Sequence, residues 1–345
     1  MKYWKIVNAE NKCWLIPTKN AKTALEIYQP SSRNGILLKK LLPLFSHISS
    51  IWSPFEIVDD PIDKQLVEFI SKMFPGKELT ISAFLGTPCV HQKATIQISE
   101  GEKLVAYCKY SDSKDVTELF DKEQSLLNKL EQAGICHVPR CLYNSKPTDF
   151  DKQVFVMTTE KTLKSEVVHE WTENHEQFIK QLKQRTRQLM KYEDTDYCKR
   201  IQILKARIND LPECVDASAV EKCIEEISQK YAGKEIEAVA MHGDFTPWNM
   251  FRQNGHLFVF DWEYAMQSTP VNLDKYHFYT QHSFFENHWT AEQMTSNAET
   301  SWMDKEEYKM YVVMIMSVFV CREKGKCSNT PLFAMWNELL KKLAY

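Results

Sequence analysis

The stretch HGDFTPWNMFRQNGHLFVFDWE, residues 242–263, contains the signals that decide the fold. Asn254-Gly255 near its centre is typical of a two-residue β-hairpin turn, because both central residues of a type I′ turn adopt positive φ. Apolar residues stand before this dipeptide at 250–251 and after it at 257–260. We therefore predict two short antiparallel strands joined at the Asn-Gly turn.

The predicted hairpin brings two potential metal ligands to one end. Antiparallel pairing about the turn places Asn249 opposite Phe260, and Asp261 is the next residue along the chain. Mg²⁺ prefers oxygen ligands and completes its shell with water and substrate phosphates. The Asn249 amide and the Asp261 carboxylate are therefore candidate magnesium ligands.

A further carboxylate, Asp244, precedes the hairpin in a loop that contains Gly243 and Pro247. This carboxylate can approach the same end of the hairpin without binding the metal. There it would accept a hydroxyl proton and orient that hydroxyl toward a phosphate. Each polar residue taken alone is better explained as a group that satisfies nearby backbone atoms. The three in this order around an Asn-Gly turn favour a phosphoryl-transfer site.

The pattern HGDxxxxN, followed by Asp-Trp-Glu at 261–263, resembles the active-site signature of the aminoglycoside phosphotransferase and choline kinase family, relatives of the protein kinases. The resemblance implies that Asp244 is the catalytic base and that Asn249 and Asp261 bind the metal. It also implies that His242 braces the loop. The resemblance is specific over 242–263 and loose elsewhere.

The two residues after Asp261 separate the branches of this fold. Trp262-Glu263 stands where protein kinases have Phe-Gly, and no Ala-Pro-Glu motif follows. Both observations favour a small-molecule kinase over a protein kinase. Two interpretations of Glu263 are left open, a group that supports the metal site and a solvated charge at a strand end.

The segment before this stretch contains the lysine and the glutamate that a kinase-like small lobe requires. Lys109 ends a strand predicted over 103–110, and Glu123 falls on the apolar stripe of a helix predicted over 115–132. A carboxylate on the buried face of a helix is costly unless it is paired. We expect Lys109 to pair with Glu123 and to anchor the α- and β-phosphates of ATP. In the alternative, Glu123 lies at the edge of the stripe in solvent.

Three further residues are candidates for nucleotide binding. Gly86 and Thr87 lie between strands predicted over 79–85 and 93–98, where a loop that covers the nucleotide is expected. The GxGxxG pattern of protein kinases is missing there, so an ordinary hairpin is the alternative. Met157 lies near the end of a later predicted strand, and its position assigns it to the hinge that contacts adenine.

Two further residues, one after the loop at 242–249 and one inside it, are expected to have other roles. Asp274 resembles the aspartate with which this family braces the loop, so we expect it to be structural. Trp248 is the aromatic residue that we place at the acceptor, because aromatic rings stack on sugars or hold quaternary ammonium groups. The variant HGDFTPWN loosely resembles kinase-like proteins of glycan pathways, which favours a sugar hydroxyl.

The order of predicted elements indicates an α+β chain with a two-lobed, protein-kinase-like fold and an extra N-terminal segment. We divide it into an N-terminal extension of unknown role (1–75), a small nucleotide-binding lobe (76–160) and a large helical catalytic and substrate lobe (161–345). Helical spacing in the last part predicts helices over 174–192, 199–209, 217–231 and 305–321.

Composition excludes several classes of partner. The 345 residues carry a net charge of -3, without the basic footprint of a nucleic-acid-binding protein. No apolar run approaches the ~20 residues of a transmembrane segment, and the N-terminus lacks the features of a secretory signal. The ten cysteines include no CxxC pair. Reduced thiols and a cytoplasmic protein are therefore expected.

These features predict an ATP- and Mg²⁺-dependent phosphotransferase that moves the γ-phosphate to a hydroxyl of a small molecule. A sugar, an aminoglycoside-like and a choline-like acceptor are all open, as is the oligomeric state. The alternative is a pseudokinase that binds nucleotide or acts as a scaffold, since the phosphate loop retains only Gly86. A protein kinase is less favoured.

Overall fold

The computed structural model of the chain describes residues 1–345 except 31–32, 46–54, 88–90, 298–301, 324–328 and 345. The chain forms two compact units. The first unit contains residues 1–128 and 137–166, and the second contains residues 129–136 and 167–345.

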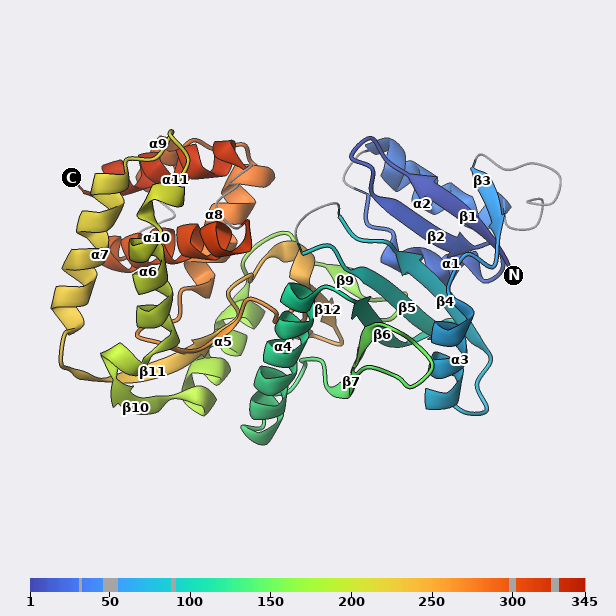
Figure 1. Cartoon of the computed structure of the whole chain (residues 1–345). Helices are drawn as coiled ribbons and strands as arrows, with labels where there is room; N and C mark the ends of the chain where they lie inside the picture. Colours follow the sequence, from blue (N-terminus) through green and yellow to red (C-terminus); the bar gives the residue numbers. More distant parts are fainter. Residues whose placement is uncertain (31–32, 46–54, 88–90, 298–301, 324–328, 345) are drawn as a thin grey trace. The chain divides into compact units, whose positions relative to one another are not determined.

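The first unit is built on one antiparallel sheet of eight strands (Figure 1). In chain order its strands are β1 (Lys2–Val7), β2 (Cys13–Pro17), β3 (Glu56–Asp59), β4 (Leu79–Phe84), β5 (Ala94–Glu100), β6 (Lys103–Ser111), β7 (Cys141–Ser145) and β8 (Gln153–Thr158). Their order across the sheet is β3-β1-β2-β4-β5-β6-β8-β7.

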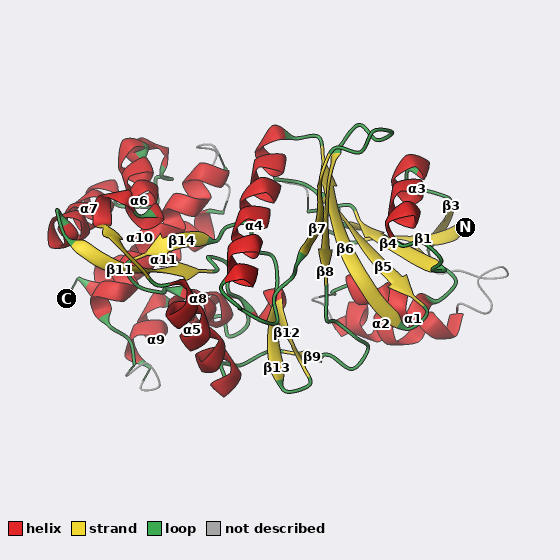
Figure 2. Ribbon diagram, turned by 90° about the horizontal axis from the view of Figure 1, so that it is seen from below, coloured by secondary structure: helices red, strands yellow, loops and turns green. Residues whose placement is uncertain are grey.

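Helices cover both faces of this sheet. Figure 2 shows α3 on one face and α1 with α2 on the other. Because successive side chains of a strand point to opposite faces, β1 contributes Tyr3 to the core under α3, whereas Trp4 and Ile6 enter the core under α1 and α2. The helices of this unit are α1 (Ala21–Ala24), η1 (Leu25–Ile27), α2 (Arg33–Phe45), α3 (Lys64–Met73) and α4 (Lys114–Gln132), whose last turn is grouped with the second unit.

The first 75 residues take part in the same sheet as the strands that follow. The predicted N-terminal hairpin is present as β1 and β2, and β2 pairs with β4 through Trp14 and Phe84, whose rings are stacked at 5.0 Å. This pairing satisfies the backbone groups of β4, which would otherwise form an open sheet edge. The domain boundary at residue 75 stays a prediction.

The second unit is mainly helical, and its central helix is buried on almost all sides. In this helix, α10 (Lys305–Arg322), all side chains from Tyr308 to Val320 are buried except those of Lys309 and Phe319, as expected for a helix in the middle of a core. No helix among the described residues is long and apolar enough to cross a membrane. The other helices are α5 (Glu173–Thr186), η2 (Tyr192–Asp194), α6 (Asp196–Ala206), η3 (Ile208–Asp210), α7 (Ala217–Tyr231), η4 (Pro247–Asn249), α8 (Asp274–Phe285), α9 (Ala291–Ser296) and α11 (Thr330–Leu343).

Short strands complete the second unit. A small sheet has the order β10-β11-β14, and β12 with β13 forms a hairpin. Their bounds are β10 (Gln188–Lys191), β11 (Glu235–Met241), β12 (Met250–Gln253), β13 (His256–Val259) and β14 (Met266–Thr269), while β9 (Glu166–Val167) lies at the boundary between the units.

The prediction of one helix over 174–192 is wrong at its C-terminal end. Helix α5 ends at Thr186, and the residues that follow form β10, which pairs with β11 through Gln188 and Ala238. Backbone pairing with a strand far along the sequence here outweighs the local helical pattern.

Candidate active site

The β12–β13 hairpin has the register that the sequence predicts. Met250 is paired with Val259, and the Phe260 N–H donates to the Asn249 carbonyl at 3.0 Å. The two turn residues have positive φ, 51° at Asn254 and 79° at Gly255. Asn249 and Asp261 therefore flank the same end of the hairpin.

The loop before the hairpin depends on a glycine. Gly243 has a φ of +80°, and a Cβ atom at this position would overlap the backbone carbonyl of Tyr264. Only glycine combines this backbone conformation with so close an approach. The conformation of the loop thus follows from a single residue type at 243.

Asp274, at the start of α8, braces the loop as predicted. Its carboxylate is fully buried and accepts the backbone N–H of His242 at 2.8 Å and that of Gly243 at 3.0 Å. Asn272 donates to the same carboxylate at 3.1 Å. Two backbone donors and one side-chain donor compensate for the burial of this charge.

His242 links the loop to the hairpin. Its Nδ1 accepts the Asp244 N–H at 3.2 Å, so its Nε2 bears the hydrogen and donates to the Phe260 carbonyl at 3.0 Å. Burial lowers the pKa of His242, although nearby carboxylates oppose this effect. The neutral imidazole is therefore a structural bridge in the loop.

Both carboxylate oxygens of Asp244 accept a hydrogen bond from a side chain. Asn249 Nδ2 donates to Oδ2 at 2.8 Å, and His277 Nε2 lies 3.1 Å from Oδ1. The Asp244 side chain is 31% exposed, whereas that of His277 is 2% exposed. A carboxylate that is oriented from behind and open on one side can accept a proton from a hydroxyl.

His277 was missed by the sequence reasoning, which assigned no role to it. A signal was present, because His277 lies three residues after Asp274 and residues at this spacing share a helix face. Only the contact with Asp244 shows which face of α8 meets the loop.

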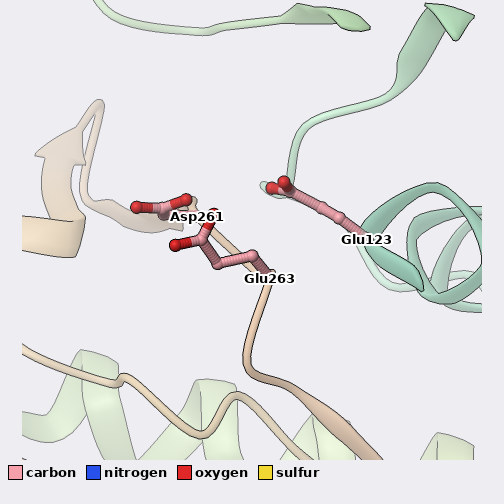
Figure 3. Close-up of side chains that lie close together, drawn as sticks. All are labelled: Glu123, Asp261 and Glu263. Carbon is pink, nitrogen blue, oxygen red and sulfur yellow. The ribbon is translucent and has the colours of Figure 1, made fainter. Parts of the chain in front are cut away.

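Asp261 and Glu263 place two carboxylates side by side after the hairpin (Figure 3). Their oxygens lie within 4.8 Å of each other, and Glu263 is 8% exposed. Asp261 adopts a φ of 69°, which is uncommon for a residue with a side chain and recurs at functional sites. The burial of Glu263 excludes the solvated charge that the sequence left open.

The donors at this end of the hairpin fit a magnesium ion. Two like charges held close together, of which the Glu263 carboxylate is buried, are stabilised by a cation. Carboxylate and amide oxygens are the ligands that Mg²⁺ takes. The Asn249 amide nitrogen donates to Asp244, which leaves the amide oxygen as the atom able to bind a metal. The residues Asn249, Asp261 and Glu263 would thus supply oxygen ligands alone.

The predicted ion pair in the first unit is present. Lys109 Nζ of β6 lies 2.8 Å from Glu123 Oε2 of α4, and the two side chains are 7% and 0% exposed. Figure 3 shows the Glu123 carboxylate projecting from its helix. The alternative in which Glu123 is solvated is therefore excluded, and the role of the pair in nucleotide binding stays a prediction.

The other nucleotide-binding candidates are also in the first unit. Gly86 has a φ of +86°, and a Cβ there would overlap the Lys93 carbonyl, so this turn requires glycine. Thr87 is exposed at the end of the described part of the loop, whose residues 88–90 lie outside the described residues. Met157 is buried in β8 between β6 and β7. The assignment of these residues to nucleotide binding stays a prediction.

Trp248 is an exposed residue of the loop at 242–249. It is 39% exposed and contacts Phe285, which is 45% exposed, edge to face at 5.9 Å. Among the residues that the structure describes, these are the aromatic side chains that stand out as exposed. The exposed rings of Trp248 and Phe285 thus form an apolar surface beside the loop that carries the Asp244 carboxylate.

A model of a known protein family matches the part of the chain that contains most of this site. Residues 106–272, which include the loop, the hairpin and Lys109, match the model of the phosphotransferase enzyme family APH. A search of curated proteins finds no match.

Solved structures with a similar fold match most of the length of this chain. A thermostable mutant of aminoglycoside phosphotransferase APH(4)-Ia is similar with a TM-score of 0.52 and 14% identity, over 82% of this chain and 98% of that chain. A ternary complex of that enzyme with ADP and hygromycin B has a TM-score of 0.50 and 12% identity, over 80% and 96%.

The fold and the family match together define the class of this protein. At these identities the likeness shows the fold, which confirms the predicted α+β, protein-kinase-like architecture. The family match confirms the resemblance on which the sequence analysis relied. The chain is a phosphotransferase of the small-molecule kinase type.

Proposed function

We propose that this protein transfers the γ-phosphoryl group of ATP to a hydroxyl group of a small molecule, with Asp244 as the catalytic base. The observation that carries the proposal is the Asp244 carboxylate, which is oriented by Asn249 and His277 and is partly exposed. In the reaction the hydroxyl oxygen bonds to the γ-phosphorus, the bond from that phosphorus to the β–γ bridging oxygen breaks, and ADP leaves. Asp244 orients the hydroxyl and receives its proton.

Other residues of the chain would hold the phosphates and the metal. Asn249, Asp261 and Glu263 are the proposed magnesium site, and bound Mg²⁺ would neutralise charge on the phosphate oxygens. Lys109, held by Glu123, would contact the α- and β-phosphates. Most of the rate enhancement would then come from positioning and from charge stabilisation.

The nucleotide and the acceptor follow from different observations. Gly86, Thr87 and Met157 are proposed to contact ATP, and ADP is the nucleotide in the similar APH(4)-Ia complex. The exposed rings of Trp248 and Phe285 are proposed to contact the acceptor, because aromatic faces pack against sugar rings and attract quaternary ammonium groups.

The cysteines supply an argument for the compartment. The cysteines that the structure describes all carry free thiols, which suits the cytoplasm as a reducing compartment.

Magnesium-dependent release of ADP tests this function. Purified protein is assayed with ATP and Mg²⁺ against a panel of hydroxyl compounds: hygromycin B, kanamycin, glucosamine, simple hexoses and choline. At least one class is expected to stimulate ADP release above the rate with water alone, with the phosphorylated acceptor detected by mass spectrometry. ATP binding without stimulation by any member of the panel would favour the pseudokinase.

In an Asp261→Asn variant, Mg²⁺ is expected no longer to strengthen the binding of ATP. Neutralising one of two adjacent carboxylates weakens the cation site, and turnover should fall by about a hundredfold or more because several kcal/mol of charge stabilisation are lost. Calorimetric titration of ATP with Mg²⁺ and with EDTA measures the effect directly. The wild type should bind ATP more tightly in Mg²⁺ than in EDTA. In the variant, the ATP affinities in Mg²⁺ and in EDTA should be nearly equal.

Asp149→Asn serves as the matched control, because Asp149 is an exposed carboxylate in a loop of the first unit. This control should behave as the wild type in both titrations. An Asp261→Asn variant that retains the full magnesium effect would show that the ion binds elsewhere.

A further inference from the structure

His277 is a buried histidine that contacts the proposed base from behind. It lies in α8, is 2% exposed, and its Nε2 is 3.1 Å from Asp244 Oδ1. The other carboxylate oxygen accepts from Asn249 at 2.8 Å. The orientation of the Asp244 carboxylate is therefore controlled by one donor on each oxygen.

We propose that His277 is a positioning residue for phosphoryl transfer, which fixes the carboxylate plane of Asp244 through a hydrogen bond from its Nε2–H. The inference rests on the proposed role of Asp244 as the base. His277 itself touches neither the acceptor nor the phosphates in this proposal. It acts through the orientation of Asp244 alone.

The chemistry of the contact identifies His277 as the donor. An ionised carboxylate oxygen is only an acceptor, so the hydrogen must be on Nε2. On the other side of the ring, Nδ1 is buried and has no hydrogen-bond partner among the described residues. A second hydrogen on Nδ1 would add a buried donor without an acceptor. The neutral Nε2–H tautomer is the form that meets both conditions.

The imidazole is held in place by the helix that also braces the loop. Asp274, one helical turn earlier in α8, binds the backbone N–H groups of His242 and Gly243. The Tyr311 ring of α10 packs edge-on against His277 at 5.7 Å. Helix α8 thus orders the backbone of the catalytic loop through Asp274 and its reactive side chain through His277.

Loss of the His277 donor is expected to affect rate rather than nucleotide affinity. Without it, one oxygen of Asp244 has no partner and the carboxylate can rotate about its Cβ–Cγ bond. Small errors in the placement of a catalytic group reduce the rate by up to about a hundredfold. We expect kcat to fall by about 10- to 100-fold in His277→Leu, with KM for ATP within about twofold of the wild type.

Two variants separate the donor from the volume of the side chain. Leucine fills a similar space without a hydrogen-bond donor, whereas the side-chain amide of glutamine can place its nitrogen near the position of Nε2. His277→Gln should therefore recover kcat to within about threefold of the wild type. Thermal unfolding of both variants shows whether they fold. Turnover is measured as ADP release with the acceptor that stimulates the wild type most, or with water if none does.

The background of Asp244→Ala distinguishes positioning from a purely structural role. If His277 acts only through Asp244, adding His277→Leu to Asp244→Ala should leave the remaining rate unchanged. A further fall by the same factor as in the wild-type background would show that His277 supports the fold instead. Wild-type kcat in the single His277→Leu variant would also overturn the proposal.

These outcomes are distinct from failure of the proposed function. Full activity in Asp244→Ala would refute Asp244 as the base, whatever His277 does. A readout that requires no activity is the ¹⁵N spectrum of protein labelled at histidine, with the His277 signals assigned from His277→Gln. A hydrogen on Nε2 is expected, and a hydrogen on Nδ1 with none on Nε2 would overturn the proposal.

Discussion

Replacement of Asp244 by alanine should reduce turnover by at least about a hundredfold while the protein stays folded and still binds ATP. General base catalysis contributes about 10²- to 10⁴-fold in enzymes, and alanine has no group that accepts a proton. The structure adds the reason why the fold should survive. Asp244 is partly exposed, and the loop is braced through Asp274 and His242 rather than through the Asp244 side chain.

Steady-state ADP release and calorimetric titration of ATP check this expectation together. kcat should fall by at least about a hundredfold, and the ATP affinity should stay within about threefold of the wild type. The exposed Asp149→Ala variant, which removes a carboxylate far along the sequence from the loop, is the control and should retain full activity. Full activity in Asp244→Ala would mean that another group orients the acceptor.

Replacement of Lys109 by methionine should cause the largest loss of stability. It leaves the fully buried Glu123 carboxylate without its lysine, and removal of one member of a buried ion pair costs about 3–5 kcal/mol. The variant should also be inactive, since the proposed contact with the α- and β-phosphates is lost. Urea denaturation measures the change in the free energy of unfolding.

A double variant separates the two effects. Lys109→Met with Glu123→Leu replaces the pair by apolar side chains and should recover most of the stability, because such exchanges are often neutral or stabilising. Activity should not return. Lys77→Met is the matched control, because Lys77 pairs with Glu100 at 2.7 Å on the surface and its loss should cost at most about 1 kcal/mol. Recovery of activity in the double variant would show that Lys109 has only a structural role.

Much of the catalytic half of the chain was predictable because its signals are local. The Asn254-Gly255 turn sets the register of its hairpin, so the proximity of Asn249 and Asp261 follows from counting residues. The pairing of Lys109 with Glu123 followed from two observations. A carboxylate on an apolar helix stripe requires a partner, and a kinase-like small lobe has a lysine on the strand before that helix. The predicted register of the hairpin and the Lys109–Glu123 ion pair are both present in the structure.

Other parts of the fold depend on pairing between distant segments. Nothing in the local sequence shows that β2 pairs with β4 and places the N-terminal strands in the same sheet. The strand at Gln188–Lys191 continues a helical pattern and becomes β10 only because β11 offers it backbone partners. In both places the deciding hydrogen bonds are made by residues far apart in the chain.

The sequence by itself determined the class of chemistry, because the loop at 242–249 and the hairpin after it carry their residue types at a spacing that the local backbone geometry enforces. Only the tertiary structure decided how Asp244 is oriented. The packing of α8 against the loop brings Asp274 to the backbone and His277 to the carboxylate. A helix pattern specifies which residues share a face, but the element that this face meets is decided by how the whole core packs.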